Sequence, residues 1–125
     1  GVPLFLMVEL PSNVIEADRF IEKMQLTGGS IGSNDLTQLI LGIDRDSDLL
    51  SDLFDEENEA VKTAIRSVIT DARAHGVHTG LCGQAPSDYP EFACFLVNAG
   101  IDSISVNPDS FVAVKRQVAQ AETGD

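Results

Sequence analysis

The stretch Gly28-Gly-Ser-Ile-Gly-Ser-Asn-Asp-Leu-Thr-Gln38 changes from small and glycine-rich to polar, and then to helix-forming. Its short apolar run, Ser30-Ile31, is typical of a buried parallel strand. Gly32 and Ser33 follow, and their small side chains let the backbone turn and approach a ligand closely. Asp35 lies where a helix would begin, so the stretch predicts a carboxylate beside free backbone N–H groups, suited to a cation and an anion together. The simpler alternative is that this carboxylate only caps the helix.

The rest of the chain repeats this alternation of strand and helix. Strands are expected within residues 3–10, 30–31, 77–82 and 101–106. Helices are expected over residues 11–24, 36–41, 49–54, 59–74 and 87–97, and from 107 to about 121. Four successive βα units predict an α/β fold with a parallel sheet. Four units are half of a (β/α)8 TIM barrel, which typically needs about 250 residues.

The composition is that of a small acidic globular chain. It has 125 residues, a net charge of −12, and 43% hydrophobic residues, enough for one modest core. The acidity argues against a nucleic-acid partner, because phosphate backbones select basic surfaces. We expect no membrane partner either, since the chain shows neither an apolar run of spanning length nor a leader. Cys82 and Cys94 fit neither a disulfide framework nor a zinc pattern, which indicates a reduced, cytoplasmic setting.

Three chemically versatile side chains are expected at the carboxyl ends of strands, where barrel enzymes assemble their active sites. They are Glu9, Asp35 and Cys82. Two carboxylates from neighbouring strands can hold Mg²⁺ while leaving positions for water and substrate oxygens. The alternatives are that Glu9 simply reaches solvent and that Cys82 is a packed core residue, the commoner fate of cysteine.

Four motifs, taken in order, resemble those of the phosphoenolpyruvate-utilising enzymes. They are Met7-Val-Glu-Leu-Pro-Ser-Asn13, Ser30-Ile-Gly-Ser-Asn-Asp-Leu-Thr-Gln38, Asp44-Arg-Asp-Ser47 and Gly80-Leu-Cys-Gly-Gln-Ala-Pro-Ser-Asp88. The family comprises phosphoenolpyruvate synthase (pyruvate, water dikinase), pyruvate phosphate dikinase, and enzyme I of the sugar phosphotransferase system. Ser33 and Gln84, where the other branches usually have Thr and Glu, favour the synthase branch.

This resemblance implies that residues 1–125 are the second half of the family's C-terminal, phosphoenolpyruvate/pyruvate-binding TIM barrel. The chain is then expected to be a fragment that lacks the first barrel half, the phosphohistidine domain and the nucleotide-binding domain. The implied parent activity makes phosphoenolpyruvate from pyruvate, ATP and water. The alternatives are the dikinase or enzyme I type of phosphotransfer, or a non-catalytic half barrel that serves in assembly.

The resemblance also implies a role for each site residue. Glu9 and Asp35 are expected to hold the Mg²⁺ that chelates the enolate of pyruvate or phosphoenolpyruvate. Cys82 is expected to deliver a proton to the methylene carbon, and a thiol suits this because it can give or accept a proton near neutral pH. The expected substrate-binding residues are Glu9, Gly32, Ser33, Asn34, Asp35 and Arg45, the last binding phosphate through its forked donors.

Two further expectations concern surfaces. Arg45 could instead be a surface residue among its acidic neighbours, and His75 and His78 are interpreted as structural or surface residues. A half barrel exposes two sheet edges and an apolar interior, so the isolated chain is expected to self-associate or to pair with the missing half.

Overall fold

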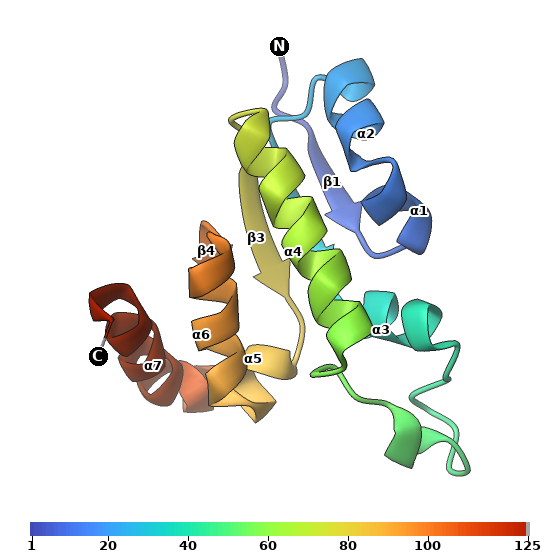
Figure 1. Ribbon diagram of the computed structural model, residues 1–125, viewed down its shortest axis with the longest axis vertical. Coiled ribbons are helices and arrows are strands. Elements are labelled where there is room, and N and C mark those ends of the chain that lie inside the picture. Colours follow the sequence, from blue (N-terminus) through green and yellow to red (C-terminus); the bar gives the residue numbers. More distant parts are fainter. Residues whose placement is uncertain (125) are drawn as a thin grey trace.

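The computed structural model describes residues 1–124 as one four-stranded parallel sheet with helices packed against it (Figure 1). The strands run in the spatial order β1 (Phe5–Val8), β2 (Gly28–Gly32), β3 (His78–Cys82) and β4 (Ser103–Ile104). The helices are α1 (Pro11–Ile15), α2 (Ala17–Met24), α3 (Ser33–Leu41), α4 (Glu59–Ala74), α5 (Ala85–Asp88), α6 (Pro90–Ala99) and α7 (Phe111–Thr123), with 3₁₀ turns η1 (Ser51–Leu53) and η2 (Pro108–Ser110). This arrangement confirms the α/β prediction and matches half of a (β/α)8 barrel.

The register of the sheet brings the carboxyl ends of the strands to one edge. Val8 of β1 pairs with Ile31 of β2, and Gly32 of β2 pairs with Cys82 of β3. In Figure 1 the arrowheads of β1 and β3 therefore point the same way, toward α1, α3 and α5. Residues that follow these strands are consequently neighbours in space although they are far apart in the chain.

One face of the sheet is covered by helices, and the core lies there. Val8, Ile31 and Leu81 are only 4%, 0% and 1% exposed. The α4 residues packed with them are Val61, Ile65, Val68 and Ile69. These residues recur at helical spacing, so the predicted buried stripe of α4 is confirmed.

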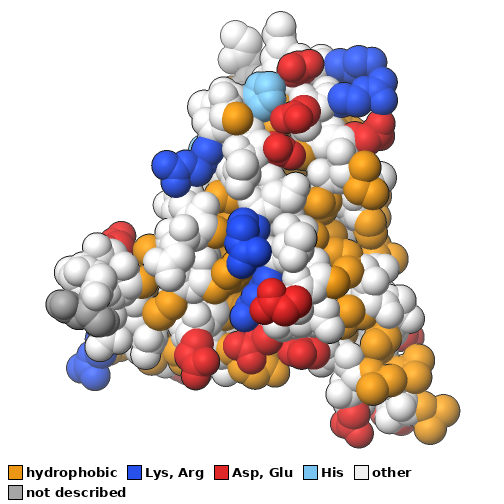
Figure 2. Space-filling view, in the orientation of Figure 1, with side chains coloured by type: hydrophobic (Ala, Val, Ile, Leu, Met, Phe, Trp, Pro, Cys, Tyr) orange, Lys and Arg blue, Asp and Glu red, His pale blue; other side chains and the backbone are white. Residues whose placement is uncertain are grey.

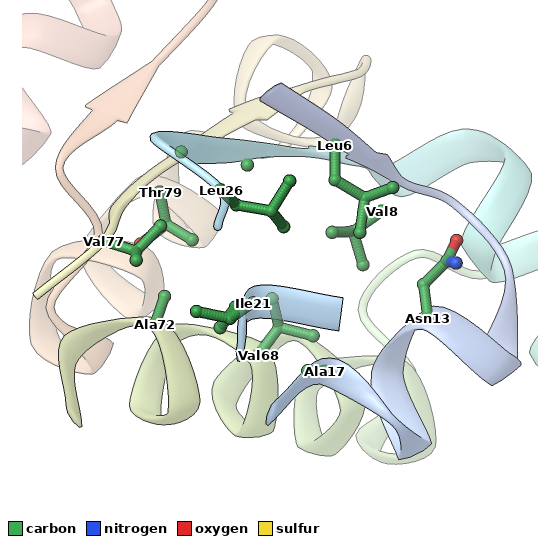
Figure 3. A pocket seen from close by; sticks show the side chains of 12 residues that line it. Leu6, Val8, Asn13, Ala17, Ile21, Leu26, Val68, Ala72, Val77 and Thr79 are labelled. Atoms are coloured by element: carbon green, nitrogen blue, oxygen red, sulfur yellow. The ribbon is translucent and has the colours of Figure 1, made fainter. Parts of the chain in front are cut away.

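Figure 3 shows the layer between this face and the helices. Apolar side chains such as Leu6, Ile21 and Val68 line a gap of about 20 Å³ there, room for roughly one water molecule. Two polar side chains also border it and are bonded elsewhere: Asn13 accepts from the backbone nitrogens of the β1–α1 turn, and Thr79 contacts Asp102. We therefore regard this space as a small packing defect and not as a ligand site.

The opposite face of the sheet is open. Phe5 and Met7 are 57% and 45% exposed, although both belong to a strand. Their neighbours on β2 at the same level are Gly28 and Ser30, which cover little surface. In a complete barrel this face would be the interior.

The segment between α3 and α4 differs most from the prediction. A helix was expected over residues 49–54, but only the single turn η1 forms. Leu49 is 92% exposed and Leu53 is 60% exposed, so no packing surface stabilises a short helix there. In Figure 2 hydrophobic side chains gather on this projecting segment at the lower right of the molecule.

Three other boundaries also moved. The helix expected over residues 11–24 is divided at Glu16 into α1 and α2. The helix expected over residues 87–97 is divided at Tyr89 into α5 and α6, because a residue before proline is held in an extended conformation. Strand β2 starts at Gly28, earlier than expected, since a glycine lets the backbone pass close to the ring of Phe5.

Both cysteines are free thiols, as expected. No helix within residues 1–124 combines the length and the apolar character that crossing a membrane requires.

Candidate active site

An open cleft of about 250 Å³ lies at the carboxyl ends of β1, β2 and β3. It is lined by Met7, Glu9, Gly32, Asn34, Asp35, Arg45, Cys82 and Gly83. These include every site residue predicted from the sequence except Ser33. Ser33 is buried, and its hydroxyl lies against Gly83 of the cleft. The structure thus brings together side chains from three βα units.

The position of Glu9 is fixed by a side chain whose role the sequence analysis missed. Glu9 directly follows β1, and the buried Asn13 accepts hydrogen bonds from the backbone nitrogens of Glu9 (3.3 Å) and Leu10 (3.1 Å). An asparagine shortly after a turn-forming Pro11 is a local signal for this kind of side-chain-to-backbone bond. The turn that presents Glu9 to the cleft is therefore held by Asn13.

Asp35 lies in the first turn of α3, where backbone N–H groups have no partner inside the helix. Ser33 starts this helix and is completely buried, and within residues 1–124 its hydroxyl has no hydrogen-bond partner. A side chain at Gly83, whose φ is 151°, would collide with that hydroxyl. Glycine at this position therefore allows the loop after β3 to approach the start of α3 closely.

A chain of hydrogen bonds connects the ends of β2, β3 and β4. The side-chain oxygen of Asn34 accepts from the backbone nitrogen of Gln84 at 3.1 Å. The Gln84 side-chain oxygen in turn accepts from the amide of Asn107 at 3.0 Å. Asn34 is thus oriented by the backbone of the loop after β3, a link that the sequence alone did not suggest.

Cys82 is the last residue of β3 and is half-buried on the open face of the sheet. The hydroxyl of Ser30 donates to its sulfur at 3.4 Å, and the thioether sulfur of Met7 lies 3.9 Å away. Gly32 leaves room beside Glu9, since a Cβ there would lie 3.2 Å from the Cβ of Glu9. The thiol therefore reaches a space that neighbouring side chains leave free.

Arg45 supplies a cation at the rim of the cleft, on the loop that follows α3. Its backbone nitrogen donates to the side chain of Gln38 at 3.4 Å. Near it lies Glu56, which is 5% exposed and whose pKa is raised to about 7, first by burial and then by the charge of Asp88. The charge of Arg45 opposes this increase. Glu56 was not predicted as a site residue, because it belongs to an acidic stretch whose composition is typical of a solvent-exposed helix surface.

The donor set of the cleft fits a hard cation. Glu9 and Asp35 supply two carboxylates to the cleft. Mg²⁺ is commonly held by one or two carboxylates together with water and substrate oxygens.

The fold is that of one half of a (β/α)8 barrel, and the cleft lies at the strand ends where barrel enzymes carry their active sites. The family described as "PEP-utilising enzyme, PEP-binding domain" matches residues 1–123, and the chain belongs to this family. It is 57% identical over 122 residues to a phosphoenolpyruvate synthase of Synechocystis sp. and 55% identical over 122 residues to that of Aquifex aeolicus. It is also 48% identical over 120 residues to the phosphoenolpyruvate synthase of Escherichia coli.

These alignments cover 98%, 98% and 96% of this chain but only 15%, 14% and 15% of the three relatives. The chain therefore corresponds to about a seventh of each relative's length, and the relatives contain much more than the domain described here.

Proposed function

We propose that this chain forms the Cys82-bearing half of the phosphoenolpyruvate/pyruvate site of a phosphoenolpyruvate synthase. The parent protein would make phosphoenolpyruvate from pyruvate, ATP and water, with a phosphohistidine carried by another domain. The observation that carries the proposal is the convergence of Glu9, Asp35, Arg45 and Cys82 on one cleft from three βα units. The names of the similar proteins support the same reaction.

Glu9 and Asp35 are the residues that would hold the divalent cation. A bound Mg²⁺ would supply positive charge where negative charge develops on the substrate oxygens. Asn34 and the N-terminus of α3 would orient the substrate carboxylate and phosphate, and Arg45 would bind the phosphate. In this arrangement the anionic substrate lies between the carboxyl ends of β1 and β2 and the loop after α3.

Cys82 would exchange the proton at carbon. In the direction of pyruvate formation, the thiol proton moves to the methylene carbon of the pyruvate enolate. The electron pair of the carbon–carbon double bond forms the new C–H bond, a lone pair of the enolate oxygen forms the carbonyl, and a thiolate remains. The hydroxyl of Ser30, 3.4 Å from the sulfur, can stabilise that thiolate by donating a hydrogen bond. In the reverse direction the thiolate removes a proton from the methyl group.

Two other functions are kept as alternatives. The resemblance of Ser33 and Gln84 to the synthase branch argues against pyruvate phosphate dikinase or enzyme I. A non-catalytic half barrel would bind neither Mg²⁺ nor phosphoenolpyruvate, so calorimetric titration of both into the complete protein separates this alternative from the enzymatic ones.

The experiment that tests the proposed role uses Cys82→Ala in the complete protein. Exchange of the methyl hydrogens of pyruvate into deuterated water should be lost, whereas partial exchange between ATP and the phosphohistidine should persist, because that half-reaction occurs elsewhere. Cys94→Ala, which removes the other free thiol, is the matched control and should retain both activities. If Cys82→Ala keeps methyl exchange, Cys82 is only a packing residue.

A further inference from the structure

Asn107 follows β4 at the carboxyl-end edge of the sheet and is not among the residues that line the cleft. Its side-chain amide nitrogen donates to the side-chain oxygen of Gln84 at 3.0 Å, and its backbone nitrogen donates to the hydroxyl of Ser87 at 3.1 Å. Gln84 is the N-cap residue of α5, and Ser87 lies within this helix. Asn107 therefore holds the loop after β3 at two points.

The same loop determines how the amide of Asn34 is turned. The backbone nitrogen of Gln84 donates to the Oδ1 atom of Asn34 at 3.1 Å. Because a backbone N–H can only donate, Asn34 directs its oxygen toward the loop and its amide nitrogen away from it. Asn34 also lines the cleft. An anion in the cleft would therefore meet a hydrogen-bond donor at Asn34 and not an acceptor.

The two ends of this loop are anchored in different ways. Ala85 and Pro86 at the start of α5 are buried, so packing fixes that end. Gln84 is exposed and follows Gly83, whose φ of 151° lies in a region that glycine adopts most readily. Packing therefore contributes little at Gln84, and the hydrogen bond from Asn107 to its side chain restrains it instead.

We propose that Asn107 and the side chain of Gln84 are positioning residues for substrate binding. Together they fix the loop after β3, so that Asn34 presents its amide nitrogen to an oxygen of phosphoenolpyruvate. This proposal rests on the proposed function, because it takes phosphoenolpyruvate as the anion bound in the cleft. Breaking the pair should lower the affinity for phosphoenolpyruvate and leave phosphorylation of the distant histidine by ATP unchanged.

The test measures phosphoenolpyruvate affinity calorimetrically in the complete protein. Asn107→Ala removes the donor to Gln84, and Gln84→Ala removes the acceptor but keeps the backbone nitrogen that bonds to Asn34. Each variant should bind about fivefold more weakly, the effect of one hydrogen bond. The double variant should bind no more weakly than either single variant, because both break the same bond. Partial exchange between ATP and the phosphohistidine should stay at the wild-type rate in all of them.

Asn34→Ala tests whether the effect passes through Asn34. In this background Asn107→Ala should weaken binding no further, because the side chain that it positions is gone. Asn98→Ala truncates the same type of side chain on the exposed surface of α6 and, as the matched control, should bind like the wild type.

Two results would overturn the proposal. One is wild-type affinity in Asn107→Ala, or in Gln84→Ala should Asn107→Ala not fold. The other is a fivefold loss from Asn107→Ala that persists in the Asn34→Ala background, since Asn107 would then act on stability or on another contact. Absence of phosphoenolpyruvate binding by the wild type, or wild-type affinity in Asn34→Ala, would instead overturn the proposed function on which it rests.

Discussion

The two faces of the sheet use neighbouring residues for different purposes. Ile31 points toward the helices and is fully buried, whereas Ser30, one residue earlier, lies on the open face and bonds to the sulfur of Cys82. The same alternation separates Val8 from Met7 on β1. Successive strand residues point to opposite sides of the sheet. One residue can therefore stabilise the core while its neighbour contacts the side chains of the cleft.

Glycines on the open face let side chains of neighbouring strands lie directly over them. A Cβ at Gly80 would lie 2.5 Å from the hydroxyl of Ser103, and one at Gly28 would lie 2.5 Å from the ring of Phe5. The helix-covered face has large, branched residues at the corresponding positions. The difference teaches that the helix-covered face is packed within this chain by large side chains, while the open face has small residues and is the side that the rest of a barrel would cover.

The largest effect should come from emptying the packed face. Ile31→Ala should lower the free energy of unfolding by about 2–5 kcal/mol, because it removes a completely buried side chain and leaves a cavity. Ser30→Ala, on the adjacent residue, should lower it by less than about 1 kcal/mol. Urea denaturation followed by circular dichroism measures both. If both variants lost the same free energy of unfolding, the open face would contribute to stability as much as the helix-covered face does, and this comparison would be wrong.

The buried acid beside the site should make stability depend on pH. Burial raises the pKa of Glu56 in the folded chain to about 7 from its ordinary value of 4.5, so the folded chain holds this proton more tightly. Its contribution is fully present below about pH 4.5 and is lost as pH rises through 7, amounting to about 3 kcal/mol. The measurement is the wild-type free energy of unfolding minus that of Glu56→Gln across this range. A difference that is constant with pH would show that Glu56 titrates normally.

A change at the site should affect activity and leave stability nearly unaltered. Asp35→Asn in the complete protein should lower turnover at least about a hundredfold, equivalent to roughly 2.7 kcal/mol, through loss of the charge that would hold the cation. The control is Asp48→Asn, which neutralises an exposed acid on the following loop and should leave turnover nearly unchanged. Wild-type turnover and Mg²⁺ dependence in Asp35→Asn would refute this assignment.

Much of this comparison could be predicted from the sequence. Local patterns located all four strands, because buried parallel strands are short apolar runs, and the α4 stripe followed from its spacing. The ordered motifs selected Glu9, Asp35, Arg45 and Cys82, which the structure places at one cleft. These predictions depended on patterns of neighbouring residues and on the rule that strand ends carry the site.

Other features depend on contacts between distant segments and left no local trace. Ser30 acquires its role only because β2 pairs with β3, which brings it within 3.4 Å of the sulfur of Cys82. Glu56 is buried although it belongs to an acidic run, since the fold places it near α5 and the loop after α3. The helix expected over residues 49–54 failed for the opposite reason: its apolar residues find no partner.

The smallest predicted effect concerns the open face of the chain by itself. Leu4, Phe5 and Met7 are 42%, 57% and 45% exposed on or beside β1, an outer strand of the sheet. Covering such apolar surface is favourable by about 25 cal/mol per Å², so residues 1–125 alone should self-associate at micromolar concentration.

Phe5→Ser removes the most exposed of these three side chains and should weaken the association about tenfold, or roughly 1.4 kcal/mol. The control is Val2→Ser, which also replaces an exposed apolar side chain by serine but at a residue that precedes the strand. Sedimentation equilibrium measures all three proteins. A monodisperse wild-type monomer with cooperative unfolding would show that the open face needs no cover, and the half barrel would then be self-sufficient.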